Sequence, residues 1–236
     1  MAGSFHLGTS GFAYDEWMHG VFYPEGVRPA GRLAYYASVF NSVEINYTFR
    51  RFPSAGLFEG WRNQTPETFR FTLKASAKIT HVGRLQNPGP MVELFVERAA
   101  ALGPRMGPVL FRVPEELPYD EELVLAFADA LPAGLAAVVE CREPSWRPAR
   151  VLLEQRGVAW CVTDMDEETS RPQELSRPLG YLRLRRESYD DAELGAWAER
   201  ITEATVTGRD VYCYFRHEDA AAGPRMALRL RELLGG

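Results

Sequence analysis

Short apolar runs alternate along the chain with longer segments whose apolar residues recur at helical spacing. The short runs are typical of strands and the i, i+3, i+4 spacing is typical of helices. Strands are expected at Phe5–Thr9, Val43–Asn46, Phe69–Lys74, Val109–Val113, Ala137–Arg142, Val158–Asp164, Tyr181–Arg185 and Val211–Arg216. Helices are expected at Leu33–Phe40, Ser54–Arg62, Val92–Leu102, Glu121–Leu131, Trp146–Arg156, Ala192–Ala204 and Arg225–Leu234. Eight alternations predict parallel pairing in a TIM-like eightfold β/α barrel, with an open doubly wound sheet as the alternative.

The sixth crossover is the weakest part of this pattern. Asp166 to Pro178 is polar and holds two prolines, so most of it is expected to be loop. No Gly/Ser-rich linker or low-complexity tract divides residues 1–236. The pattern therefore predicts a single barrel domain.

Charged residues share one face of the predicted strands. Successive side chains of a strand point to opposite faces, and the apolar set must lie beneath the helices. The polar set is then expected inside the barrel, where its C-terminal mouth gathers Glu44, Lys74, Arg112, Glu140, Arg142, Asp164, Arg183 and Arg185. By the same alternation Cys141, Cys161 and Cys213 are expected to face the helices as small buried hydrophobes.

The charge of this cluster differs from that of the whole chain. The chain carries a net charge of −5, so the molecule as a whole is not expected to bind nucleic acid or anionic membranes. The eight clustered residues carry five positive and three negative charges, which favours a small anionic ligand with carboxylate or phosphate groups. No apolar run approaches the ~20 residues of a membrane span, no signal peptide is visible, and the three separated cysteines suit a reducing cytoplasm.

Motifs spread over most of the chain resemble one known family. They are Gly8-Thr9-Ser10-Gly11-Phe12, Tyr14, Trp17, Phe22-Tyr23-Pro24, Tyr36-Ala37, Phe40, Val43-Glu44-Ile45-Asn46, Thr48-Phe49, Pro53, Trp61, Thr65-Pro66, Phe69, Lys74, Thr80-His81, Glu140-Cys141-Arg142, Ser145-Trp146, Asp164, Tyr181-Leu182-Arg183-Leu184 and Tyr212 to Phe215. In this order they resemble the YecE-like family, a domain of unknown function. The resemblance implies a TIM-like barrel and no particular reaction.

The chain departs from the family pattern at the presumed mouth. Arg112 stands where the family has glutamine, Arg185-Arg186 where it has His-Gly, Arg216-His217 where it has paired asparagines, and Met226 where it has asparagine. Three of these changes add positive charge. They imply either that the ligand is more anionic than that of other family members or that the original activity of the family has weakened in this chain.

Several residues of the cluster can carry acid/base chemistry. Glu140 and Asp164 are the preferred proton-transfer pair, and Glu44 is expected to orient a substrate alongside Asn46. The alternative is that these carboxylates only neutralise Arg142, Arg183 and Lys74. Lys74 is either an anion anchor or, with a lowered pKa, a Schiff-base nucleophile. His81, in the loop after the third strand, is the candidate that titrates near neutral pH.

Aromatic residues follow several of the predicted strands. Tyr14, Trp17, Trp146 and Tyr189 can stack on a sugar or base, or simply pack the loops of the mouth. The chain has four histidines and no HExxH motif, so neither a metal site nor a cofactor is predicted. A single magnesium or manganese ion held by carboxylates is kept as an alternative.

Three functions follow as hypotheses. The first is an enzyme, a hydrolase, lyase or isomerase, that acts on a small anion at the mouth, where Lys74, Arg112, Arg142, Arg183 and Arg185 bind it. The second is a ligand-binding or scaffold protein with a degenerate site. The third is a nucleic-acid-processing protein, which the acidic composition disfavours. The oligomeric state and the substrate do not follow from the sequence.

Overall fold

A computed structural model describes residues 1–165, 174–216 and 221–235. Eight parallel strands lie in the order β1-β8-β7-β6-β5-β4-β3-β2, and a parallel bridge between Ser10 and Glu44 joins the two ends of this order. They are β1 (Phe5–Thr9), β2 (Ser42–Ile45), β3 (Arg70–Lys74), β4 (Met106–Arg112), β5 (Ala137–Glu140), β6 (Ala159–Asp164), β7 (Gly180–Leu184) and β8 (Val211–Phe215). The predicted eightfold β/α barrel is confirmed.

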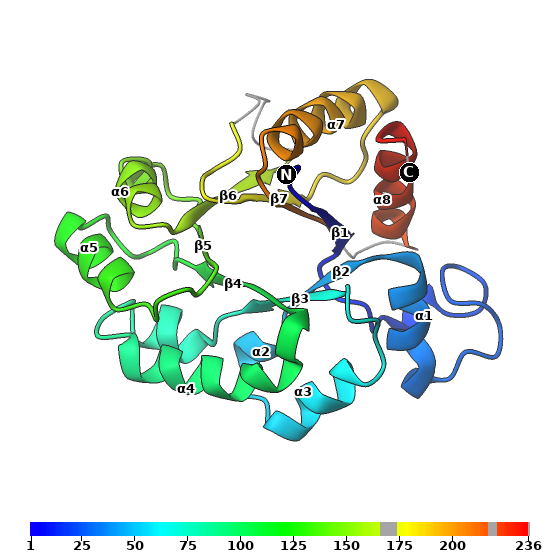
Figure 1. Cartoon of the computed structure of the whole chain (residues 1–236), viewed down its shortest axis with the longest axis horizontal. Helices are drawn as coiled ribbons and strands as arrows, with labels where there is room; N and C mark the ends of the chain where they lie inside the picture. Colours follow the sequence, from blue (N-terminus) through cyan, green and yellow to red (C-terminus); the bar gives the residue numbers. More distant parts are fainter. Residues whose placement is uncertain (166–173, 217–220, 236) are drawn as a thin grey trace.

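Helices surround the strands on the outside (Figure 1). They are α1 (Arg32–Val39), α2 (Tyr47–Arg50), α3 (Ala55–Arg62), α4 (Gly89–Ala99), α5 (Glu121–Asp129), α6 (Ala149–Gln155), α7 (Asp191–Val206) and α8 (Ala222–Leu233). The longest, α7, begins at a capping box in which Asp190 and Glu193 each accept a hydrogen bond from the other's backbone N–H. Among the described residues no helix is long and apolar enough to cross a membrane.

The sixth crossover connects β6 to β7. Its described residues, 165 and 174–179, form no helix, and the remaining residues 166–173 of the segment predicted to be loop lie outside the described part. Each of the other connections along the chain includes at least one helix.

Apolar side chains form two cores. The larger lies between strands and helices, with Leu7, Phe71 and Leu182 among its members. The smaller fills the barrel interior with Leu110, Val138, Ala159, Cys161, Leu179, Tyr181, Tyr212 and Tyr214. The Tyr214 hydroxyl on β8 lies 2.6 Å from Ser42 Oγ on β2 and 2.7 Å from Thr72 Oγ1 on β3, so the buried phenol is hydrogen-bonded across the barrel interior.

The face expected for β6 was wrong. Cys161 belongs to the interior core rather than to the helix layer, while Trp160 and Val162 lie beneath the helices. Asp164, three residues from Cys161, therefore also lies on the helix side. The large Trp160 fits the helix layer, and the small Ala159 and Cys161 fit beside the tyrosines that fill the interior.

Candidate functional site

One buried arginine joins three strands at the carboxyl ends of the barrel. Arg183 on β7 is 3% exposed. Its Nη1 donates to both carboxylate oxygens of Glu140 on β5, at 2.7 and 2.6 Å, and its Nη2 donates to Glu44 Oε1 on β2 at 2.8 Å. We call these three residues the buried triad. Alternation along β2, β5 and β7 points their side chains into the barrel, as the sequence predicts.

Hydroxyl groups satisfy the remaining positions on the two carboxylates. Ser10 Oγ donates to Glu44 Oε1 and Tyr181 OH donates to Glu44 Oε2, each at 2.7 Å, while Thr163 Oγ1 donates to Glu140 Oε1 at 3.1 Å. Burial raises the pKa of both carboxyls, but Arg183 and the hydrogen bonds outweigh it. The pKa of Glu44 is lowered, and that of Glu140 is lowered to about 2. Both carboxylates are therefore ionised at neutral pH.

Four further basic residues, Lys74, Arg112, Arg142 and Arg185, form what we call the basic rim. Arg142 and Arg185 lie just beyond β5 and β7, which end two residues and one residue earlier than predicted. Arg142 Nε is buried without a hydrogen bond and lies 4.0 Å from Glu140 Oε1. Arg185 Nη1 is also buried without a hydrogen bond. Arg112 pairs with the carboxylate of Glu115 at 2.8 Å.

Lys74 ends β3 and is 8% exposed. Within the described part of the chain its ammonium forms no ion pair, and Nζ lies 4.1 Å from the centroid of the Phe49 ring. Burial, followed by the charge of Arg183, lowers the pKa of Lys74 to about 8. Among the described residues, the carboxylates beside Lys74, Arg142, Arg183 and Arg185 are those of Glu44 and Glu140, so these six side chains carry two more positive than negative charges.

Asp164 does not join this cluster. Arg186 Nε donates to Asp164 Oδ1 at 2.8 Å, and Trp197 Nε1 of α7 donates to Oδ2 at 3.2 Å. Thr163, next along β6, is the residue that points inward to Glu140. The expected Glu140–Asp164 pair is therefore not formed, because the two carboxylates lie on opposite faces of the sheet.

His81 and Asn46 lie close to the rim. His81 follows β3 in a π-helical turn (Lys78–Val82), and its Nδ1 lies 2.8 Å from Thr80 Oγ1. Its ring meets the Phe49 ring edge-on with centroids 4.9 Å apart, and burial followed by Lys74 and Arg112 lowers its pKa. Asn46 immediately precedes α2 and is half-buried, with no side-chain hydrogen bond to a described residue.

The predicted aromatic candidates mostly pack the loops. Trp17 and Trp146 are 0% and 1% exposed, and Trp146 Nε1 donates to the Leu117 carbonyl. Tyr14 donates its hydroxyl to the Ser10 carbonyl, and Tyr189 meets Phe215 edge-on. These contacts favour the packing alternative over stacking on a ligand.

Sequence reasoning missed four contributors: Ser10, Phe49, Thr163 and Tyr181. The alternation along β7 places Tyr181 on the face of Arg183, and this was a usable signal. Ser10 lies beyond the end of β1 and Phe49 lies in α2, so strand alternation reaches neither of them.

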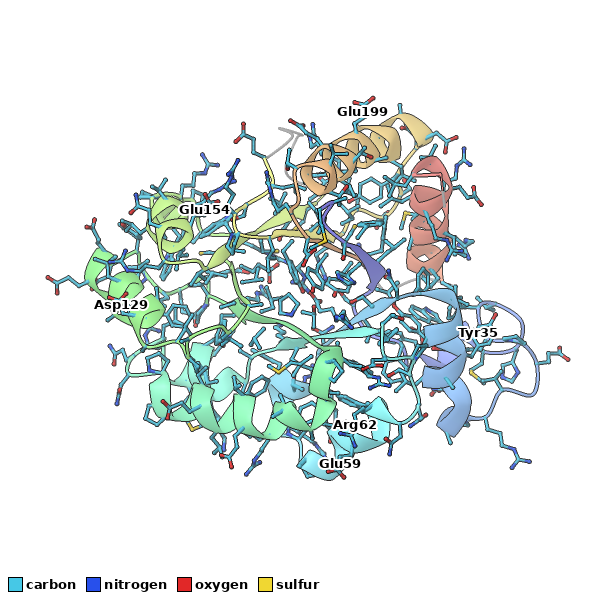
Figure 2. All side chains as sticks on the ribbon, viewed as in Figure 1. Tyr35, Glu59, Arg62, Asp129, Glu154 and Glu199 are labelled. Atoms are coloured by element: carbon cyan, nitrogen blue, oxygen red, sulfur yellow. The ribbon has the colours of Figure 1, made fainter. Side chains whose placement is uncertain are left out.

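Outside the mouth, acidic residues outnumber basic ones. Glu59, Asp129 and Glu199 lie at the periphery on α3, α5 and α7 (Figure 2). The net charge of −5 is thus compatible with a basic mouth. In residues 1–165, 174–216 and 221–235 no three His, Cys, Asp or Glu side chains are grouped to hold a metal ion.

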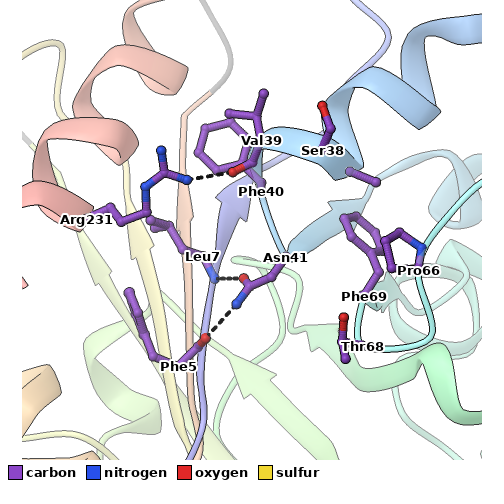
Figure 3. A pocket seen from close by; sticks show the side chains of 11 residues that line it. Phe5, Leu7, Ser38, Val39, Phe40, Asn41, Pro66, Thr68, Phe69 and Arg231 are labelled. Carbon is purple, nitrogen blue, oxygen red and sulfur yellow. Dashed lines mark hydrogen bonds between the residues drawn. The ribbon is translucent and has the colours of Figure 1, made fainter. Parts of the chain in front are cut away.

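A cavity of about 260 Å³ lies outside the barrel at the opposite ends of the strands (Figure 3). Asn41 at its wall accepts from Leu7 N at 2.7 Å and donates to the Phe5 carbonyl at 2.8 Å. Arg231 donates to the Val39 carbonyl at 2.7 Å. These polar groups bind backbone atoms, and the other lining residues are mainly apolar. The residues suited to bind a charged ligand therefore lie at the mouth and not in this cavity.

The parallel strands and their charged mouth define a β/α barrel of the TIM type. Residues 6–236 match the family described as "Protein of unknown function DUF72", and the chain belongs to it. The UPF0759 protein YecE of Escherichia coli K12 and that of strain O157:H7 are each 32% identical over 171 residues, which cover 69% of this chain and 60% of the relative. The chain thus spans about 60% of the length of these relatives. The predicted resemblance to YecE-like proteins is confirmed.

Solved structures of the same family share the fold. A DUF72 family protein from Thermotoga maritima MSB8 has a TM-score of 0.81 at 26% identity, covering 99% of this chain and 100% of that one. A DUF72 family protein from Enterococcus faecalis V583 has a TM-score of 0.78 at 17% identity, covering 98% of this chain and 96% of that one. The barrel is therefore common to members of low sequence identity.

Proposed function

We propose that the mouth of the barrel binds a small anion bearing a carboxylate or phosphate group. The observation that carries this proposal is a group of basic atoms at the mouth with no hydrogen-bond acceptor among the described residues: Lys74 Nζ, Arg142 Nε and Arg185 Nη1. A buried donor left without an acceptor destabilises the protein, and an anionic ligand supplies that acceptor. Guanidinium groups suit carboxylate and phosphate oxygens in geometry and charge.

The contacts favour binding over proton transfer by the carboxylates. Both oxygens of Glu140 accept from Arg183, and its pKa of about 2 makes it a weak base that holds no proton at neutral pH. Asp164 is held by Arg186 and Trp197. In this proposal the carboxylates position Arg183, and the basic rim contacts the ligand.

A small ligand fits better than a nucleic acid. The unpartnered donors are buried, whereas a nucleic-acid surface needs exposed basic residues that follow a phosphate backbone. Trp17 and Trp146 are packed in the core, so they offer no stacking face to a base.

Thermal unfolding with pyrophosphate, citrate and inorganic phosphate tests the proposal. At about ten times its dissociation constant, a bound anion stabilises the folded state by about 1.4 kcal/mol. We expect a stabilising anion whose effect is lost in Arg142→Ala/Arg185→Ala. Arg147→Ala, an exposed arginine five residues after Arg142, is the matched control and should respond as wild type does. An effect that persists in the double variant, or no effect with any of the three anions, would contradict the proposal.

A further inference from the structure

Lysine is rare in this chain. Of 27 basic residues only two, Lys74 and Lys78, are lysines, and the other 25 are arginines. Lys78 is exposed, whereas Lys74 is 8% exposed at the mouth. An arginine supplies positive charge but keeps its proton in proteins, whereas a lysine can become a neutral amine nucleophile. The mouth therefore holds one primary amine together with the guanidinium groups at the ends of β4, β5 and β7.

The surroundings of Lys74 favour the neutral amine. Glu44 and Glu140, the carboxylates of the buried triad, are both bound by Arg183, and neither forms an ion pair with Lys74. The contact of Nζ with the Phe49 face is weaker than a buried ion pair. Thr48 Oγ1 donates to the Lys74 carbonyl at 2.6 Å and fixes the backbone at the end of β3.

We propose that Lys74 forms an imine with a carbonyl compound whose anionic group is bound by the basic rim, such as a 2-oxo acid or an aldehyde phosphate. This inference rests on the proposed anion binding and adds a covalent step to it. Arg142 and Arg185 would hold the carboxylate or phosphate while the amine faces the carbonyl carbon. Fixing the two reactants in this way replaces a bimolecular collision by a reaction within one complex.

The step balances without any other reactant. The nitrogen lone pair attacks the carbonyl carbon, and the π electrons of the C=O bond move to oxygen. A proton passes from nitrogen to that oxygen to give a carbinolamine. The second nitrogen proton is then transferred to the hydroxyl, which leaves as water while the nitrogen electron pair forms the C=N bond. The pKa of Lys74, about 8, leaves about one amine in ten neutral at pH 7.

Reductive trapping tests the step directly. The protein is incubated with pyruvate, glyoxylate or glycolaldehyde phosphate and sodium cyanoborohydride, followed by intact mass measurement and peptide mapping. We expect one reduced adduct per chain on Lys74 with at least one probe. The yield should fall at least tenfold in Lys74→Arg and be unchanged in Lys78→Arg. Acetone, a carbonyl without an anionic group, should label at least tenfold less.

Each other outcome counts against the inference in a distinct way. An adduct on Lys78 or the N-terminus, or one that persists in Lys74→Arg, overturns it; mapping of the wild-type protein locates the adduct even if that variant does not fold. Equal labelling by acetone overturns the role of the anionic group. If the probes raise the unfolding temperature but none is trapped, the imine is wrong and anion binding stands. If they neither raise it nor become trapped, while the three anions of the binding test also have no effect, both proposals fail.

Discussion

Arg183 and Lys74 are two buried cations of the same barrel mouth, and their surroundings differ. Arg183 donates three hydrogen bonds to two carboxylates. Burial lowers the pKa of Arg183, but the charges of Glu140 and Glu44 raise it by more, so the net shift is upward. Lys74 faces an aromatic ring, and its pKa is lowered. The comparison teaches that burial alone does not mark a functional cation. Both Nη groups of Arg183 are bound to carboxylates of the fold, whereas the Lys74 ammonium has no carboxylate partner among the described residues.

The two residues therefore differ in their effect on stability. Removing one partner of a buried ion pair is strongly destabilising, because the other charge stays buried. A buried cation without a carboxylate destabilises the folded state by itself. Variants of the two residues should shift stability in opposite directions.

The largest expected effect is that of Arg183→Met. It leaves Glu44 and Glu140 buried without their cation and should lower the free energy of unfolding by about 3–5 kcal/mol. Urea denaturation at pH 7 measures it, with Arg229→Met as the control because Arg229 pairs with Asp191 and Glu232 at the exposed surface. A loss below about 1 kcal/mol would show that Arg183 does not hold the carboxylates together.

Lys74→Met should have a smaller effect of opposite sign. The folded-state pKa of about 8 lies below the ordinary value of 10.5, so the wild-type protein gains stability as pH rises from about 8 to 10.5 and lacks that gain at pH 7. The variant should therefore be more stable at pH 7 by about 1–3 kcal/mol. The same urea measurement decides, with Lys78→Met as the matched control. A destabilised Lys74→Met would mean that the lysine has a stabilising partner.

Strand alternation predicted much of the site because β7 carries different residue types on its two faces. Tyr181, Arg183 and Arg185 alternate with Leu182 and Leu184, so one face is clearly polar. In β6 most residues are apolar, and Asp164 at its end was the misleading signal. Its partners Arg186 and Trp197 lie 22 and 33 residues away on the helix side, beyond the reach of a local pattern.

Which cation is paired could not be predicted for the same reason. Arg183 is hydrogen-bonded to Glu140, which lies 43 positions earlier in the sequence, and to Glu44, which lies 139 positions earlier. The sequence places all of these charges at the mouth, but only their positions in space show that both carboxylates belong to Arg183. The availability of Lys74 is thus a property of the folded barrel.

A titration of Lys74 by NMR tests this central claim most directly. With ¹³C at the lysine ε-carbons the chain should give two lysine signals, and Lys78→Arg assigns them. The account predicts a titration midpoint near pH 8 for Lys74, because burial and Arg183 disfavour its ammonium form. A midpoint near 10.5 would show that the charge of Lys74 is compensated in the folded protein, and it would contradict the distinction between the two cations.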